Sequence, residues 1–341
     1  IRAKKYGYQF GYEDLRLIYK NSKIKLAYFT SDFYEHAGMI NMEGIFKHHD
    51  KNKFEIYAFD YGNFHQDSTH KRVKKYFNHF FYIDKKSDDE VIKIIKDHKI
   101  DIVIHRNGYS QNSRNSLFAK KLAPLQISFL GYPGTMGVKF IDYIIADKVV
   151  IPKKNKKFFS EKLIYLPNTY YPTNNERKIS LKNYNRTTLN INNEAFVFGC
   201  FNNTYKISSK EFSIWMSLLS KINNSYLILL VNDEITKKNL TKEIINNNQD
   251  PSRVKFLNFI SNDEHLARHQ LIDLYLDTFN YNGHTSTVDA LYAGVPVITK
   301  IGNSFTARVC ASILKAVNMP ELITYNQEEY LNLAFEIATN K

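Results

Sequence analysis

Cysteine, tryptophan and long apolar runs are scarce in this sequence. Two cysteines and one tryptophan occur among its 341 residues. Cys200 and Cys310 each lie inside a short apolar run, where buried free thiols are common. Two such cysteines exclude a disulfide framework and favour a reducing compartment. No apolar run approaches the roughly 20 residues that a membrane-spanning helix needs, and no secretory signal opens the chain, so we expect a soluble, cytoplasmic protein.

Acidic residues are also in deficit. The chain has 47 lysines and arginines against 34 aspartates and glutamates, and its formal net charge is +13. This sign admits nucleic acid, an anionic membrane or an anionic small substrate as a partner. The lysines are dispersed, with a denser cluster only at residues 153–157, whereas a nucleic-acid footprint concentrates basic residues on one face. We therefore expect neither nucleic acid nor membrane as a partner, and a basic nucleic-acid binder is an alternative suggested by charge alone.

The sequence does contain a regular alternation of strand-like and helical segments. In the first half, strands are predicted at residues 24–30, 54–59, 79–83, 100–104 and 125–130, with helices at 39–48, 88–98 and 115–122. In the second half, strands are predicted at residues 195–201, 226–231, 254–259, 274–279 and 295–299, with helices at 208–222, 236–247, 307–317 and 327–339 and others opening at 261 and 284. Capping boxes of the Ser-x-x-Glu type mark helix starts at Ser87, Ser208 and Ser261. The alternation predicts parallel sheets covered by helices on both faces.

One interruption of this alternation divides the chain. We expect residues 1–22 to be an upstream tail and residues 23–151 to form a first lobe. Residues 152–193, rich in Pro, Lys, Asn and Tyr, are expected to be a linker and interface segment, and residues 194–341 a second lobe. The expected fold class is α/β, with two Rossmann-like, doubly wound lobes facing a cleft and ligands beyond the carboxyl ends of the strands. Because the chain stops directly after a helical pattern, we expect it to be a fragment of a longer product.

One stretch in the second lobe carries most of the chemistry. Residues 274–290 read L-Y-L-D-T-F-N-Y-N-G-H-T-S-T-V-D-A, a strand-like run followed by an Asn-Gly turn. A helix that begins at residues 284–287 offers backbone N–H groups without internal partners at the positive end of its dipole, which favours a bound phosphate. Asp289, on the same opening turns, can accept hydrogen bonds from hydroxyls beside that anion. The alternative is an ordinary hydroxyl-rich N-cap with a solvated aspartate.

Two further side chains follow strands at the ligand edges of their lobes. Lys206 lies in F-N-N-T-Y-K after the strand at 195–201, where a lysine can act as a point charge on a phosphate held by backbone amides. His36 lies in S-D-F-Y-E-H after the first strand and can orient or deprotonate an incoming group. The alternatives are a solvated surface lysine and a merely structural histidine.

Metal binding has little support in the sequence. His265 and His269 lie one helical turn apart in D-E-H-L-A-R-H, but this is not H-E-x-x-H, and no third ligand or D-x-D pair accompanies them. The glycine-rich loop at residues 130–137 lacks the lysine and the spacing of a phosphate loop, so we interpret it as a tight turn lining the cleft. We expect neither a metal nor a cofactor.

These residues belong to a longer series of ordered blocks. Between about residues 23 and 339 the chain contains S-D-F-Y-E-H, N-G-Y-S, A-P-L-Q-I-S-F-L-G-Y-P-G-T-M-G, I-D-Y-I-I-A-D, F-N-N-T-Y-K, D-E-H-L-A-R and N-G-H-T-S-T-V-D-A-L-Y-A-G-V-P-V-I-T. In these blocks it resembles the catalytic region of the O-GlcNAc transferase family, with its bacterial relatives and plant relatives of the SPINDLY type. The resemblance implies a GT-B fold and metal-independent, inverting transfer of a sugar from a nucleotide sugar to a protein hydroxyl.

The resemblance also implies roles for individual residues. Those that match nucleotide-sugar ligands of the family are Lys206 at the leaving diphosphate, His284, Thr285 and Ser286 at the diphosphate-binding turn, Asp289 at the ribose, His265 beside the uracil, and Asn203 on the phosphate side, where relatives often carry Gln. His36 matches an active-site histidine once proposed as the catalytic base, a role that is contested within the family.

The chain departs from the family pattern in three places. His105 precedes Arg106 where relatives commonly have Asp or Asn at the first position, which can alter acceptor contacts. The tetratricopeptide array that usually precedes this region is absent, and we expect residues 1–22 to be its end. The closing helices expected after residue 341 are missing as well, which leaves open whether this fragment alone is active.

The expected donor is UDP-GlcNAc, and the expected partners are this nucleotide sugar and acceptor proteins. Plant relatives that use GDP-fucose lack both the G-H-T of the central turn and the aspartate at position 289, whereas this chain keeps both. The alternatives are a GDP-fucose or other UDP-hexose protein glycosyltransferase, transfer to asparagine instead of a hydroxyl, or a nucleotide-sugar-binding module without turnover.

Overall fold

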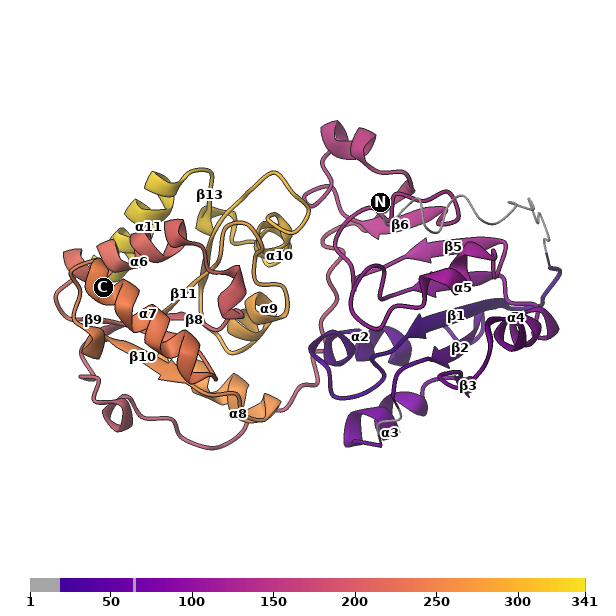
Figure 1. The fold of residues 1–341 in the computed structure, drawn as a ribbon, viewed down its shortest axis with the longest axis horizontal. Coiled ribbons are helices and arrows are strands. Elements are labelled where there is room, and N and C mark those ends of the chain that lie inside the picture. The colour runs from indigo at the N-terminus through magenta and orange to yellow at the C-terminus, as the bar shows by residue number, and fades with distance from the viewer. Residues whose placement is uncertain (1–18, 64–65, 341) are drawn as a thin grey trace. The chain divides into compact units, whose positions relative to one another are not determined.

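The chain folds into two α/β units. The computed structural model describes residues 19–63 and 66–340, and the units are residues 1–175 and 176–341 (Figure 1). Most of the expected upstream tail, residues 1–18, lies outside the described residues.

The first unit is built on a seven-stranded parallel sheet. Its strands are β1 (Ile24–Thr30), β2 (Phe54–Asp60), β3 (His79–Tyr82), β4 (Ile102–His105), β5 (Leu125–Ser128), β6 (Tyr143–Ala146) and β7 (Lys162–Tyr165). Its helices are α2 (Ala37–Lys47), α3 (Ser68–Lys74), α4 (Asp88–Asp97) and α5 (Asn115–Ala119), with a 3-10 helix η1 (Lys153–Phe158). The strand order is β3-β2-β1-β4-β5-β6-β7, so the direction of the crossovers reverses between β1 and β4. A ligand site is expected beside such a switch point.

The second unit repeats the arrangement with six strands. They are β8 (Phe196–Cys200), β9 (Ser225–Leu230), β10 (Val254–Leu257), β11 (Leu274–Leu276), β12 (Val297–Lys300) and β13 (Ile323–Thr324). The helices are α6 (Ser209–Lys221), α7 (Glu234–Asn246), α8 (Asn262–Ala267), α9 (Thr285–Tyr292), α10 (Val309–Ala316) and α11 (Gln327–Thr339), with 3-10 helices η2 (Arg186–Leu189), η3 (Thr204–Lys206), η4 (Pro251–Arg253), η5 (Arg268–Leu271) and η6 (Pro320–Leu322). The order β10-β9-β8-β11-β12-β13 places the switch point between β8 and β11.

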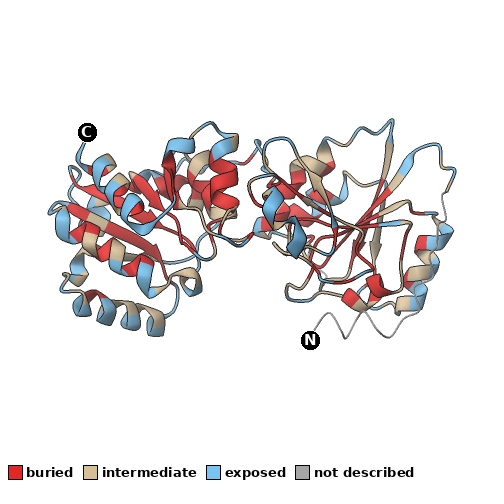
Figure 2. Cartoon of the chain, turned by 90° about the horizontal axis from the view of Figure 1, so that it is seen from above, coloured by how far each residue is buried: buried red, intermediate tan, exposed pale blue. Residues whose placement is uncertain are grey.

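Burial explains why these segments become strands. Every residue of β8 is buried, as are the last five residues of β1, because helices cover both faces of each sheet. Figure 2 shows the buried strands inside each unit and the exposed residues on the outer faces of the helices. The only tryptophan of the chain, Trp215 on α6, lies in the core of the second unit among Phe198, Leu229 and Tyr330. The predicted α/β class with two parallel sheets is confirmed.

Several elements differ from the sequence predictions. Strands β6, β7 and β13 and helix α3 were not predicted, because segments of seven residues or fewer show little periodicity. Strand β7 lies inside residues 152–193, the segment expected to be a linker, and extends the first sheet. Strand β11 ends at Leu276, three residues earlier than predicted. The Asp277 amide still donates a hydrogen bond to the Ile298 carbonyl of β12 at 3.1 Å, and the Asp277 side chain accepts one from the Gly283 amide.

Of the three predicted capping boxes, one forms. Ser87 accepts a hydrogen bond from the Glu90 amide, and the Glu90 carboxylate accepts one from the Ser87 amide. At the start of α6 the buried Glu211 instead turns inward and accepts a hydrogen bond from the Phe279 amide at 2.8 Å. At the start of α8, Glu264 pairs with Lys182. Glu211 still accepts the Ser208 hydroxyl hydrogen, but at neither helix does the serine accept the amide hydrogen bond that would complete the box.

Across residues 19–63 and 66–340, no helix has both the length and the apolar character needed to cross a membrane.

Candidate functional site

The candidate site of the second unit lies at the switch point between β8 and β11. Lys206 ends the 3-10 helix η3 that follows β8, and residues 277–284 form the turn between β11 and α9. The two strands are paired, with Leu274 opposite Phe198, so both connections leave the same edge of the sheet. The fold therefore brings together the two segments that the sequence singled out.

Lys206 lies against the turn that precedes α9. Its ammonium donates a hydrogen bond to the Asn282 carbonyl at 3.2 Å and lies 4.2 Å from the centroid of the Tyr281 ring. Burial lowers the pKa of Lys206 to about 8, while the negative charge of Asp277 acts in the opposite direction. Lys206 is thus a half-buried cation beside the start of a helix, and not the solvated surface lysine of the alternative interpretation.

The start of α9 is suited to an anion. In the described structure this helix has no side-chain cap hydrogen bond and no acidic residue in its first turn, so its positive end is not neutralised locally. His284 stands at the N-cap, and burial, followed by the nearby charge of Lys206, lowers the pKa of its imidazole to about 3. Ser286 donates its hydroxyl hydrogen to Asn202, and Thr287 donates to the Gly283 carbonyl at 2.7 Å.

Gly283 makes this turn possible. A Cβ atom at that position would lie 2.8 Å from the hydroxyl oxygens of both Ser286 and Thr287, closer than real Cβ contacts come. A larger residue would therefore push the hydroxyls of the first turn out of place. The glycine of the Asn-Gly pair is therefore a steric requirement of the turn and not only a turn signal.

Two residues of this site were missed by the sequence prediction. Asp277 is fully buried and accepts hydrogen bonds from the Gly283 amide at 2.5 Å, from Thr299 Oγ1 at 2.6 Å and from Asn202 Nδ2 at 3.3 Å. Asn202 is buried as well, whereas its neighbour Asn203, the residue singled out in the sequence, is exposed. The position of Asp277 directly after the apolar run L-Y-L was the available signal.

Asp289 is engaged by a residue from far earlier in the chain. Arg177 Nη1 lies 2.6 Å from Asp289 Oδ1, and His265 Nε2 lies 3.8 Å from Oδ2. Burial raises the pKa of Asp289, and the adjacent Arg177 guanidinium opposes that rise. Arg177 also donates to Asn262 Oδ1 at 3.1 Å. Asp289 is therefore a buried, ion-paired carboxylate. Its partner Arg177 lies in the expected linker, residues 152–193, and was not predicted from the sequence.

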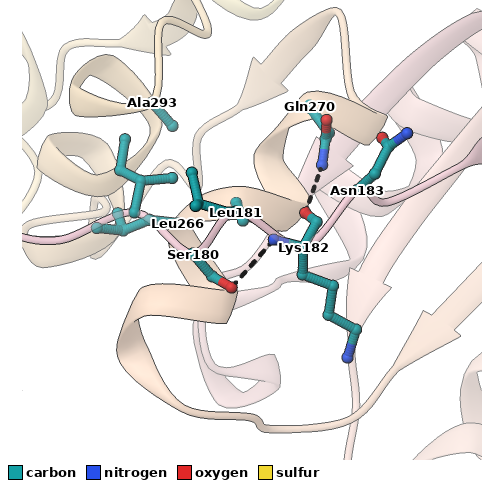
Figure 3. Close-up of a pocket in the computed structure, with 9 residues that line it drawn as sticks. Ser180, Leu181, Lys182, Asn183, Leu266, Gln270 and Ala293 are labelled. Carbon is teal, nitrogen blue, oxygen red and sulfur yellow. Dashed lines mark hydrogen bonds between the residues drawn. The ribbon is translucent and has the colours of Figure 1, made fainter.

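The segment that carries Arg177 is fastened across α8 and α9. Ser180 donates its amide hydrogen to the Asp263 carbonyl at 3.1 Å, and Tyr292 on α9 donates to the Arg177 carbonyl at 2.9 Å. Figure 3 shows how Gln270 reaches the Lys182 carbonyl beside a cavity of about 340 Å³. These contacts hold the Arg177 side chain over Asp289.

The histidine pair on α8 and η5 is packed into the same region. Arg268 donates to His265 Nδ1 at 2.5 Å, and His269 Nδ1 lies 2.8 Å from the His265 carbonyl. Burial, followed by the charge of Arg268, holds the pKa of His265 far below its ordinary value. Within the described residues, no group of three His, Cys, Asp or Glu side chains has a metal-binding arrangement.

This packing predicts an acid sensitivity of the second unit. Burial lowers the pKa of His269 to about 4, whereas an unfolded histidine titrates near 6.5, so the unfolded state binds the proton first. The stabilising contribution is complete above pH 6.5 and is lost as the pH falls toward 4. Between pH 8 and pH 5, His269 alone should cost about 2 kcal/mol of unfolding free energy. Denaturation followed by Trp215 fluorescence measures this, and His269→Asn should remove that part of the loss, whereas an unchanged pH slope would contradict it.

In the first unit, His36 stands at the N-cap of α2, beyond the end of β1. Its Nδ1 accepts a hydrogen bond from the Gly38 amide at 3.2 Å, so the neutral ring carries its hydrogen on Nε2. Burial, and then the positive charge of Arg106, lower the pKa of His36, while Asp32 opposes them. Arg106 is itself buried and paired with Asp32. His36 is therefore held as a neutral imidazole.

His105, the departure noted in the sequence, is a core residue. It is fully buried, its Nε2 lies 2.6 Å from Asn115 Oδ1, and its ring stacks on Phe118 with centroids 3.8 Å apart. Burial lowers its pKa to about 4. The glycine-rich loop follows the neighbouring strand β5, and a Cβ atom at Gly131 would lie 2.2 Å from the Arg106 carbonyl oxygen, so glycine is needed where this loop approaches the segment after β4.

Comparisons with known proteins cover the length of this chain. The family model described as Glycosyl transferase family 41 matches residues 3–181 and 172–341. A protein of Arabidopsis thaliana named probable UDP-N-acetylglucosamine–peptide N-acetylglucosaminyltransferase SEC is 31% identical over 325 residues, which are 94% of this chain and 33% of that protein. The SPINDLY protein of the same plant, also named as a probable transferase of that type, is 29% identical over 331 residues, 93% of this chain and 35% of that protein.

A solved structure is similar over nearly the whole chain. A mutant of the O-GlcNAc transferase of Thermobaculum terrenum superposes with a TM-score of 0.84 at 24% identity, over 93% of this chain and 60% of that one. The likeness confirms the predicted fold class. The chain spans about a third of the length of the curated relatives named here.

Proposed function

This chain belongs to glycosyl transferase family 41, and we propose that the protein containing it transfers GlcNAc from UDP-GlcNAc to serine and threonine hydroxyls of other proteins. The names of its plant relatives specify this donor and a peptide acceptor. We further propose that transfer inverts the anomeric carbon, needs no metal and takes place in the cytoplasm. The two buried free cysteines support a reducing compartment.

One observation carries this proposal: Lys206 converges with the start of α9. The ammonium is hydrogen-bonded at residue 282, and the helix begins at residue 285. A diphosphate bound there meets both a cation and the positive end of a helix dipole. Lysine is suited to this task because it acts as a point charge on phosphate.

The reaction needs charge stabilisation at the leaving group. Breaking the bond between the anomeric carbon and the diphosphate places additional negative charge on the diphosphate. A fixed ammonium and fixed backbone amides stabilise that charge more strongly in the transition state than in the ground state, which lowers the barrier. Ser286, held by Asn202, and His284, held neutral by burial, complete the first turn around this group.

The nucleoside is assigned to the neighbouring residues. Asp289 is the proposed ribose ligand, and His265, on the adjacent α8, the residue beside the uracil. Both oxygens of Asp289 have a cationic or imidazole neighbour, so the carboxylate is already oriented before a ribose binds. Asn203 remains proposed on the phosphate side, although its side chain is exposed.

On the acceptor side we propose His36 as an active-site residue. Because its Nδ1 is occupied by the Gly38 amide, the nitrogen left for a substrate is Nε2, which carries the hydrogen. His36 would then donate a hydrogen bond to an oxygen of the acceptor or of the sugar. This orients a reacting group without taking up its proton.

The donor can be identified by supplying each candidate nucleotide sugar separately. We expect the full-length protein, incubated with an acceptor protein and either UDP-GlcNAc, UDP-glucose or GDP-fucose, to release nucleotide only with UDP-GlcNAc. Intact-mass analysis of the acceptor should show the addition of one or more N-acetylhexosamine residues. Release from GDP-fucose alone would refute the donor, and binding of UDP-GlcNAc without any release would favour a non-catalytic nucleotide-sugar-binding module.

A further inference from the structure

Asp277 is a buried residue that is hydrogen-bonded to the segments forming the candidate diphosphate site. It follows β11 and is fully buried. Three donors converge on its carboxylate from three different segments: the Gly283 amide of the turn, the Thr299 hydroxyl of β12 and the Asn202 amide after β8. An ionised carboxylate only accepts hydrogen bonds, so this arrangement fits the charged form.

The same contacts link Asp277 to two of the groups proposed to touch the diphosphate, Lys206 and Ser286. Gly283, which it holds, is adjacent to Asn282, whose carbonyl accepts the hydrogen bond from Lys206. Asn202, which it also holds, accepts the hydroxyl hydrogen of Ser286 in the first turn of α9. A shift of Asp277 would therefore move both the Asn282 carbonyl, which accepts the hydrogen bond from Lys206, and the first turn of α9.

We propose that Asp277 is the positioning residue of this site, which anchors the turn before α9 and supplies the negative charge that keeps Lys206 protonated when no diphosphate is bound. The inference rests on the proposed function, because it assumes that a diphosphate occupies this turn. It adds a residue that acts through Lys206 and does not touch the substrate.

The charges around Lys206 make Asp277 the decisive neighbour. Among the residues that the structure describes, the titratable groups that act on the ammonium, apart from the Tyr281 ring, are Asp277 after β11, Cys200 at the end of β8 and His284 at the start of α9. Burial raises the pKa of Cys200 to about 12, and that of His284 is near 3, so both are neutral around pH 8. Burial raises the pKa of Asp277 to about 6, and it is ionised there. Asp277 is thus the anion among these groups in the range where Lys206 titrates.

The test is the pH dependence of nucleotide binding by the full-length protein. UDP affinity, measured by calorimetry between pH 6.5 and 9.5, should fall in the wild type around pH 8, where Lys206 loses its proton. In Asp277→Asn the midpoint of this fall should move to lower pH by about one pH unit, because an opposite charge near a lysine has been removed. Asp277→Ser provides a second neutral replacement if the asparagine variant does not fold.

Two variants separate charge from loosened packing. Thr299→Val removes a hydrogen bond from the same buried cluster but leaves the Asp277 charge, so the midpoint should stay at the wild-type pH. Lys206→Arg carries a guanidinium that stays charged throughout this range, so the fall near pH 8 should disappear with or without Asp277→Asn.

The outcomes are distinct. An unmoved midpoint in both neutral variants of Asp277, or an equal shift in Thr299→Val, overturns the role of Asp277 while leaving the proposed function intact. If the wild type does not bind UDP at any pH, the proposed function fails, and the inference fails with it.

Discussion

Replacing Lys206 with alanine is expected to lower kcat for sugar transfer by about 10³-fold while leaving the second unit folded. Removing one preorganised group that stabilises developing charge typically costs 10²- to 10³-fold in kcat. Lys206 is proposed as such a group, because its ammonium is hydrogen-bonded to the turn before α9. The half-buried ammonium makes one hydrogen bond to a carbonyl, so its loss removes little packing. Initial rates with UDP-GlcNAc and an acceptor protein measure the effect.

A matched control is available on the next helix. Lys210, an exposed residue in the first turn of α6, carries the same charge, and Lys210→Ala should leave kcat within about twofold of the wild type. Equal loss in the two variants would mean that net charge, and not position, matters. Full activity of Lys206→Ala would contradict the proposed role of the lysine, and a wild type with no turnover to lose would point to a nucleotide-sugar-binding module.

The architecture could be predicted from the sequence because most of its strands and helices have recognisable local patterns. Buried parallel strands appear as short apolar runs, and covering helices appear as amphipathic segments, so their alternation indicated two sheets. Strands at the margins gave no such signal. Strand β7 is only partly buried and follows a lysine-rich 3-10 helix, so its membership of the first sheet depends on pairing with β6.

The site was predicted where its residues lie close in sequence or match a motif. Lys206 and residues 284–287 could be placed together because each follows a neighbouring strand of the expected sheet. Asp277 was hidden inside a run interpreted as strand; its place directly after the apolar residues L-Y-L was a signal, but the bond from the Gly283 amide to its side chain is seen only in the structure. Arg177 lies 112 positions before Asp289 in the sequence, in an irregular segment, and no periodicity indicates such a contact.

Replacing Arg177 with methionine should destabilise the second unit by roughly 3–5 kcal/mol, because it leaves Asp289 buried without its ion-pair partner. The remaining neighbour, His265, lies 3.8 Å away and has a strongly lowered pKa, so it is neutral and cannot replace the guanidinium. UDP affinity should fall as well, since a carboxylate without Arg177 takes up a proton more readily and accepts fewer hydrogen bonds from a ribose. Denaturant unfolding followed by Trp215 fluorescence measures the loss of stability.

The cause of this loss can be isolated by removing the charge on both sides. In the double variant Arg177→Met/Asp289→Leu no buried charge remains unpaired, so most of the stability should return although the ion pair is gone. UDP affinity should stay low, because the proposed ribose ligand is absent. Lys178→Met, in the same segment but exposed, should change neither quantity by more than about 0.5 kcal/mol. If Arg177→Met alone is as stable as the wild type, the pair does not fasten this segment to α9; if the double variant binds UDP normally, Asp289 is not the ribose ligand.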